Sequence, residues 1–119
     1  MKAEKFEDLL VWQFARVLTV EIYRLFEHSK KYYYKDQINR ASLSIMNNIA
    51  EGFERRSNKD FRQFLFLAKG SSGEVRSMLH IAKDLNFIDE GQYIKLLNSS
   101  IEISKMISGL ISKIWYFYP

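Results

Sequence analysis

The chain has 119 residues, of which 47% are apolar and 27% charged, and its formal net charge is +4. This length suits one compact domain with a single continuous core, which we expect to span residues 1–119. The absence of cysteine excludes disulfides and thiolate metal sites, and no apolar run approaches the ~18 residues that a membrane-spanning helix needs.

The beginning of the chain, MKAEKFEDLL, carries too many charges to form the apolar core of a signal peptide. An oxidising compartment is also not indicated, because the chain has no cysteine to pair. Together these features predict a soluble, cytoplasmic protein.

Apolar residues recur at spacings of three and four along four long segments, a pattern typical of amphipathic helices. The first predicted helix covers about residues 7–27, with Glu7 and Asp8 in its first turn, where the helix dipole favours acidic side chains. The second covers about residues 34–54, after the polar connection HSKKYYYKD.

The third predicted helix covers about residues 58–86 and begins at a capping box, S-N-K-D, in which the Ser57 side chain accepts the backbone N–H of Asp60 and the Asp60 side chain can bond back. Asp89 caps the fourth, which covers about residues 90–117. Four serines lie in the apolar stripes: Ser42, Ser72, Ser100 and Ser104. Long helices with short connections predict an all-α fold, an antiparallel up-down-up-down four-helix bundle.

The second predicted helix carries a polar arc that includes Asn47, Asn48, Glu51 and Arg55. At spacings of three and four these side chains can bond to one another and to nearby backbone groups, so we interpret them as structural. A catalytic alternative, with Glu51 as a base, stays open. Gly52 is unfavourable inside a helix, which predicts a close approach of another backbone or the approaching helix end.

The apolar arc of the same helix covers more than half of its circumference, which is wider than a surface helix of a monomeric bundle needs. The arc includes Leu43, Met46 and Ala50, which we expect to contact another subunit. The alternative is a deeply set helix in a monomer.

Positive charge is concentrated in one part of the chain. Residues 55–83 hold seven basic and two acidic side chains, a net of +5, and the other residues have a net of −1. The basic residues are Arg55, Arg56, Lys59, Arg62, Lys69, Arg76 and Lys83. The last four recur every seven residues, and heptad spacing drifts only about 20° per repeat, so they predict one stripe about 31 Å long.

Such a basic stripe fits the successive phosphates of RNA or DNA. The alternatives are a solvated helix face and a docking surface for an acidic protein partner. Beside the stripe lie Phe66, which could stack on a base, and Gly70 and Gly73, for which we expect close packing between helices.

Signals for an enzyme are weak. The chain lacks the Glu-x-x-His pairs of carboxylate-bridged di-metal bundles, so we expect no metal and no other cofactor. The pair Arg76 and His80 resembles the motif of helical-bundle ribonucleases of the HEPN type, but three residues separate the pair here and four to six in that family. A ribonuclease therefore remains only an alternative, and we assign no catalytic residue.

Five blocks of the sequence resemble the four-helix-bundle proteins encoded by intervening sequences within bacterial 23S ribosomal RNA genes. They are F-E-D-L-L-V-W-Q at 6–13, Q-I-N-R-A-S-x-S-I-x-N-N-I-A-E-G at 37–52, R-R-S at 55–57, F-x-x-F-L-x-x-A-K-G-S at 61–71, and Glu74. The chain departs from that family in the first connection, where FEHSKKYYYKDQI replaces a segment with Phe-Pro and Gly-Leu.

The resemblance implies an antiparallel bundle that assembles into a homopentameric ring, and it implies no known catalytic activity. The family is similar in fold to accessory proteins of diversity-generating retroelements, which are basic pentamers that bind nucleic acid and a reverse transcriptase. The sequence thus predicts a non-enzymatic, oligomeric bundle that binds RNA or DNA.

Overall fold

Four α-helices make up most of the protein. The computed structural model describes residues 3–55 and 57–117, and their regular elements are the 3-10 helix η1 (Phe6–Asp8) and the helices α1 (Leu10–Phe26), α2 (Tyr32–Glu54), α3 (Asn58–Asp84) and α4 (Glu90–Phe117). No strand occurs within these ranges. The predicted all-α four-helix bundle is confirmed.

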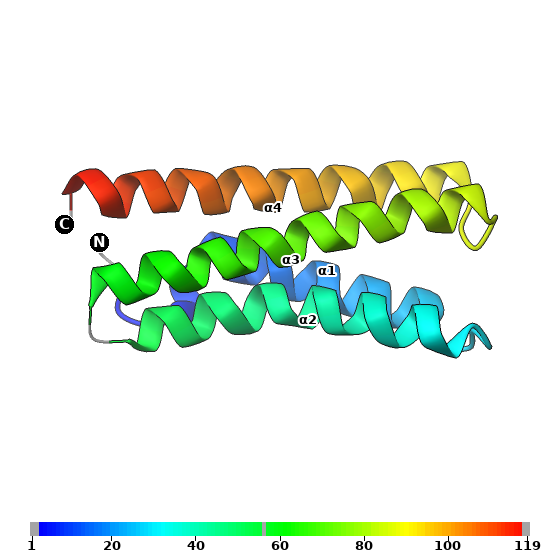
Figure 1. Ribbon diagram of the computed structural model, residues 1–119, viewed down its shortest axis with the longest axis horizontal. Helices are drawn as coiled ribbons and strands as arrows, with labels where there is room; N and C mark the ends of the chain where they lie inside the picture. Colours follow the sequence, from blue (N-terminus) through cyan, green and yellow to red (C-terminus); the bar gives the residue numbers. More distant parts are fainter. Residues whose placement is uncertain (1–2, 56, 118–119) are drawn as a thin grey trace.

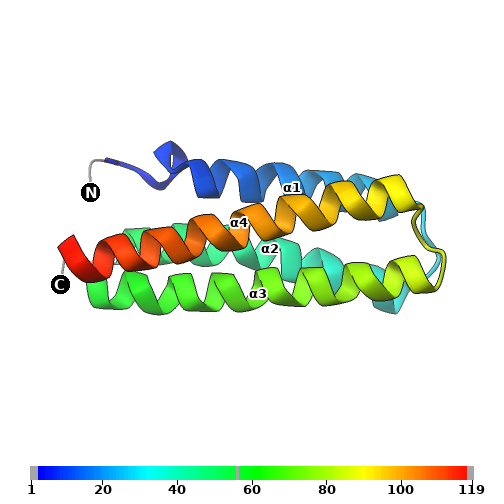
Figure 2. The ribbon, with the colours of Figure 1, turned by 90° about the horizontal axis from the view of Figure 1, so that it is seen from above.

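The helices lie side by side in a rod of 45 × 20 × 20 Å (Figures 1 and 2). Each helix packs against two others, in the order α1, α2, α3, α4 and back to α1, and the α2–α3 interface is the most extensive while α1–α4 is the least. The α2–α3 connection lies at one end of the rod, here called the α2–α3 end, and the other two connections lie at the opposite end (Figure 1).

The first helix begins later than the sequence predicts. Glu7 and Asp8 belong to η1, and the extended backbone of Leu9 (φ −76°, ψ 122°) separates η1 from α1. A continuous helix would point Phe6 and Leu9 away from the buried stripe of α1. The break instead buries Leu9 and lets the Phe6 ring meet Trp12 edge-on, with ring centroids 5.1 Å apart.

The ends of the next two helices also differ from the expected ones. α2 begins at Tyr32, two residues early, so Tyr34 lies within its first turn and donates a hydrogen bond to the Met78 carbonyl at 2.8 Å. Burial raises the pKa of the Tyr34 phenol well above its usual range.

α3 ends at Asp84, two residues early, in a Schellman motif. Asn86 is left-handed (φ 59°), the Phe87 N–H reaches the Ala82 carbonyl at 2.8 Å, and the Asn86 N–H reaches the Lys83 carbonyl at 3.0 Å. Asparagine tolerates the left-handed region better than most residues, which fixes the stop at this position.

Both predicted helix caps are present. The Ser57 hydroxyl accepts the Asp60 N–H at 3.1 Å, but the Asp60 carboxylate does not accept a hydrogen bond from Ser57 in return. At the start of α4, the Asp89 carboxylate accepts the Gln92 N–H at 2.7 Å, and the Gln92 side chain accepts the Asp89 N–H at 2.9 Å. This reciprocal pair forms a complete capping box, which sequence reasoning had identified only through Asp89.

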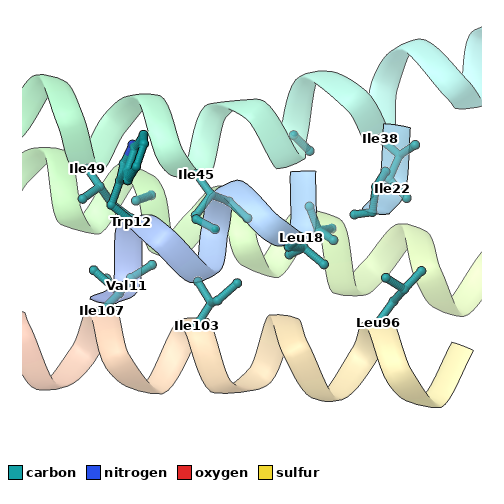
Figure 3. Close-up of a cluster of buried hydrophobic side chains, with 14 of the residues drawn as sticks. Val11, Trp12, Leu18, Ile22, Ile38, Ile45, Ile49, Leu96, Ile103 and Ile107 are labelled. Atoms are coloured by element: carbon teal, nitrogen blue, oxygen red, sulfur yellow. The ribbon is translucent and has the colours of Figure 1, made fainter. Parts of the chain in front are cut away.

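The core is built from aliphatic side chains of all four helices. Figure 3 shows Leu18 and Ile22 of α1, Ile38 and Ile45 of α2 and Ile103 of α4 among those that fill the interior. Of the four serines predicted in the apolar stripes, Ser42, Ser72 and Ser100 are fully buried, whereas Ser104 is only partly buried. The Ser72 hydroxyl donates to the Ser100 carbonyl at 3.0 Å and so ties α3 to α4. Within the described ranges, no helix is both long and apolar enough to cross a membrane.

Glycine positions divide into two kinds. A Cβ on Gly52 would lie 2.6 Å from the Phe64 Cβ and 3.0 Å from the Phe61 ring, so the predicted close approach of another backbone is confirmed. A Cβ on Gly70 would meet nothing within 4 Å, and one on Gly73 only the Arg76 guanidinium at 4.0 Å. The expectation that Gly70 and Gly73 allow close packing between helices of the chain is wrong, because both lie on an open face of α3.

Candidate nucleic-acid interface

The predicted basic residues that the structure describes lie at the end of α2 and along α3. Arg55 follows α2, Lys59 lies in the first turn of α3, and the four heptad-spaced residues follow along that helix. Arg56 lies outside the described residues. Lys59 and Lys69 are exposed, and Arg62, Arg76 and Lys83 are partly buried.

The heptad stripe of α3 faces the seam with α4. At its far end, the Lys83 ammonium lies 3.0 Å from the Glu90 carboxylate and 4.6 Å from the centre of the Tyr93 ring. The hydrogen bond to Glu90 raises the pKa of Lys83, and the positive charge is partly neutralised within the chain. Lys83 is therefore a weaker candidate for a phosphate contact than the sequence suggests.

Arg55 is also engaged within the chain. Its guanidinium lies 3.1 Å from a Glu51 oxygen and stacks over the Phe64 ring at 4.9 Å. By contrast, neither Lys59 nor Lys69 forms an ion pair with a described residue. The cations most available to a polyanion are therefore Lys59 and Lys69.

The structure adds two cations that the linear charge count missed. The pairs Ser72–Ser100 and Lys83–Glu90 place the first half of α3 beside the second half of α4. Both halves lie toward the α2–α3 end (Figure 2). Lys105 and Lys113 are exposed on this part of α4, and neither residues 61–73 nor residues 103–117 contain an acidic side chain. Counting the charges of each half of a helix separately would have identified this surface. It is here called the basic end and comprises Lys59, Lys69, Lys105 and Lys113.

The polar arc of α2 lies partly against α3. The Asn48 amide donates to the Ser44 carbonyl and hydroxyl, both at 2.9 Å, and the Ser44 hydroxyl is 2.9 Å from that of Ser71 on α3. Glu51 holds Arg55, and Asn47 is exposed. Asn48 and Glu51 thus have bonding partners within the fold.

Arg76 and His80 lie one turn apart on the flank of α3 that faces α4. The His80 Nδ1 atom is 2.8 Å from the Tyr93 hydroxyl of α4, and the two rings meet edge-on with centroids 5.5 Å apart. The His80 ring is therefore fixed against α4 in an exposed position.

Of the three residues predicted to contact another subunit, only Leu43 exposes much surface, with 46% of its area accessible. Met46 and Ala50 pack against the core of their own chain. A larger apolar surface, missed by the sequence analysis, lies on α1. Its side chains are each between 41% and 60% exposed and comprise Leu10, Phe14, Val17, Val20 and Tyr23.

The comparison with known proteins identifies the family. The sequence matches the 23S rRNA-intervening sequence protein family over residues 7–109. A similar solved structure is that of a protein of unknown function from the S23 ribosomal protein family of Bacteroides thetaiotaomicron. The two chains share 27% sequence identity and superpose with a TM-score of 0.81. The match covers 86% of this chain and 98% of that chain. No relative was found among curated proteins. The match confirms the resemblance carried by the blocks at 37–52 and 61–71, and the chain belongs to the 23S rRNA-intervening sequence protein family.

Proposed function

We propose that the protein is a non-enzymatic, oligomeric bundle that binds RNA or DNA through phosphate contacts. The observation that carries this proposal is the basic end, where α3 and α4 present Lys59, Lys69, Lys105 and Lys113. Residues 61–73 and 103–117 contain no acidic side chain, and none of the four lysines forms an ion pair with a described residue. Exposed lysines without an ion-pair partner favour a polyanion and give affinity that depends little on sequence.

Two alternatives use some of the same residues. An acidic protein could meet the same lysines, and the binding experiment below separates it from a nucleic acid. A ribonuclease would use Arg76 and His80, but no contact favours this role, since the His80 ring bonds to Tyr93. The proposal therefore assigns neither residue a catalytic role.

Binding to a labelled RNA should weaken steeply between about 50 and 200 mM salt, because each phosphate contact releases counterions. For single strands the logarithmic slope is about −0.7 per contact, so replacing Lys59 and Lys69 with glutamine should make the slope shallower by about 1.4. Fluorescence anisotropy measures the salt dependence of binding for the wild type and for the double variant. The control is Lys95→Gln, since Lys95 lies in the α1–α4 seam and pairs with Glu21 at 3.4 Å.

Absence of binding at the lowest salt would refute the proposal, as would a slope that the two glutamines leave unchanged. Poly-glutamate serves as a second ligand. If it binds as tightly as RNA, the acidic-protein alternative is the better description.

The assembly is proposed from two apolar surfaces on α1 and α3. The first is the α1 surface described above, where Phe14 and Val17 border a hollow of about 440 Å³ between α1 and α4. The second comprises Ile81 and Leu85, one turn apart at the end of α3 and each at least 45% exposed. Because α1 and α3 do not contact each other in the bundle, the two surfaces face different sides of the rod. Contact between α1 of one copy and α3 of the next is head-to-tail and can close into a ring.

Light scattering tests this arrangement through two variants that each block one surface. Val17→Glu and Ile81→Glu should each give the 14.2 kDa monomer, because a charge then replaces an apolar contact. Mixed together, they should form a dimer and no larger species, since each variant keeps one intact and complementary surface. A wild-type protein that is monomeric, or a mixture that does not associate, would rule out the head-to-tail contact.

A further inference from the structure

Phe66 is a large aromatic side chain that the bundle leaves outside its core. Its side chain is 57% exposed on α3, in the half of the helix that belongs to the basic end. Lys69 follows three residues later, and helical spacing makes the two side chains neighbours on the surface. An exposed ring beside an unpaired ammonium group combines the two elements that hold single-stranded nucleic acid, a stacking surface and a phosphate contact.

The helix surface next to Phe66 is unusually bare. Gly70 lies one turn further along α3, and Gly73 lies almost one turn beyond it. Neither has a neighbour among the described residues that requires glycine, since an added Cβ would meet nothing within 4 Å at Gly70 and only the Arg76 guanidinium, at 4.0 Å, at Gly73. Glycine disfavours a helix, so its presence twice on an open face is not explained by the fold. A bare helix surface leaves room for a flat ring lying against Phe66.

The electrostatic surroundings suit a phosphate backbone on this face. Residues 61–73 contain no acidic side chain, and Glu102, on the part of α4 beside them, borders the hollow between α4 and α1. Lys59 lies about two turns before Phe66, and Lys105 lies on the neighbouring helix, so a strand crossing Phe66 could meet further cations on either side.

We propose that Phe66 is a stacking platform for an unpaired base, and that the preferred ligand of the basic end is therefore a single strand. This inference rests on the proposed function and gives it a ligand class. In a duplex the bases are stacked on one another and their faces are covered, whereas an unpaired base can place its face on an aromatic ring. Stacking does not read the 2′-hydroxyl, so single-stranded RNA and DNA should both bind.

The test measures the affinity of the wild type, Phe66→Leu and Phe66→Trp for three ligands of the same length at one salt concentration. The ligands are oligo-U, oligo-dT and a fully paired duplex. Leucine keeps the apolar character but removes the ring. It should weaken binding of both single strands by at least about fivefold, the lower limit for loss of one stacked base, and leave duplex binding unchanged. Tryptophan should preserve single-strand binding, and its added fluorescence should be quenched when the strand binds.

The possible failures are distinguishable. If the wild type binds none of the three ligands at low salt, the proposed function fails and the platform fails with it. If the wild type binds but Phe66→Leu binds single strands as tightly, only the platform is overturned. If Phe66→Leu changes the native mass measured by light scattering, Phe66 is a subunit contact and the platform is again overturned.

Discussion

Replacing Gly52 with alanine is expected to lower the free energy of unfolding by about 1–3 kcal/mol, as overpacking of a filled site does. The new Cβ would lie 2.6 Å from the Cβ of Phe64, an atom fixed by the α3 backbone. No rotation of a side chain can relieve that contact, so α2 and α3 would have to separate across the most extensive helix interface of the bundle. Urea unfolding followed by circular dichroism measures the change.

Gly70→Ala is the matched control, since it makes the same change in another helix. A Cβ on Gly70 meets nothing within 4 Å, so alanine should stabilise the protein by up to about 1 kcal/mol through its higher helix propensity. The free energy of unfolding is thus expected to fall for Gly52→Ala and to rise for Gly70→Ala. A stabilising Gly52→Ala would show that α2 and α3 can move apart without loss of packing.

Charge reversal at the basic end should have the largest effect on binding. The double variant Lys59→Glu with Lys69→Glu removes two exposed cations, and each phosphate contact to a single strand is worth about fivefold in affinity near 0.1 M salt. We expect affinity for single-stranded RNA to fall by about 25-fold or more, because the new carboxylates also repel phosphate. The measurement is fluorescence anisotropy, with circular dichroism to show that helicity is retained.

The control for this experiment carries the same net charge at the opposite end of the rod. Lys30 and Lys31 are exposed in the α1–α2 connection, and Lys30→Glu with Lys31→Glu alters the total charge equally. A small loss of RNA affinity in this control and a large loss in the basic-end variant would locate the interface at the basic end. Equal losses would mean that RNA responds only to the overall charge of the protein.

The fold could be predicted from the sequence because its signals are local. Helical spacing of apolar residues, the Ser57 cap and Asp89 depend on neighbours within a few positions, and the structure shows the helices and caps that they predict. The break at Leu9 could not be predicted in this way. It depends on whether Phe6 and Leu9 reach the core, and that is decided by the position of the other helices.

The candidate interface was predicted less completely. Counting charges along the chain located the basic segment, but the partners of each cation lie on other helices or on the preceding turn. Glu90 forms an ion pair with Lys83, and Glu51 forms one with Arg55, whereas Lys69 has no such partner among the described residues. Lys105 joins the same surface only because α4 lies beside α3.

The sequence by itself determined the number and type of the helices, the caps of α3 and α4, the buried stripes that include Ser42, Ser72 and Ser100, and the family. These follow from spacing and local chemistry, which act between residues close together in the chain. The tertiary structure alone decided which glycine is packed, which lysines are available and where apolar side chains stay exposed. Those properties depend on distances between helices, and a distance between Gly52 and Phe64 or between Lys83 and Glu90 exists only after the chain has folded.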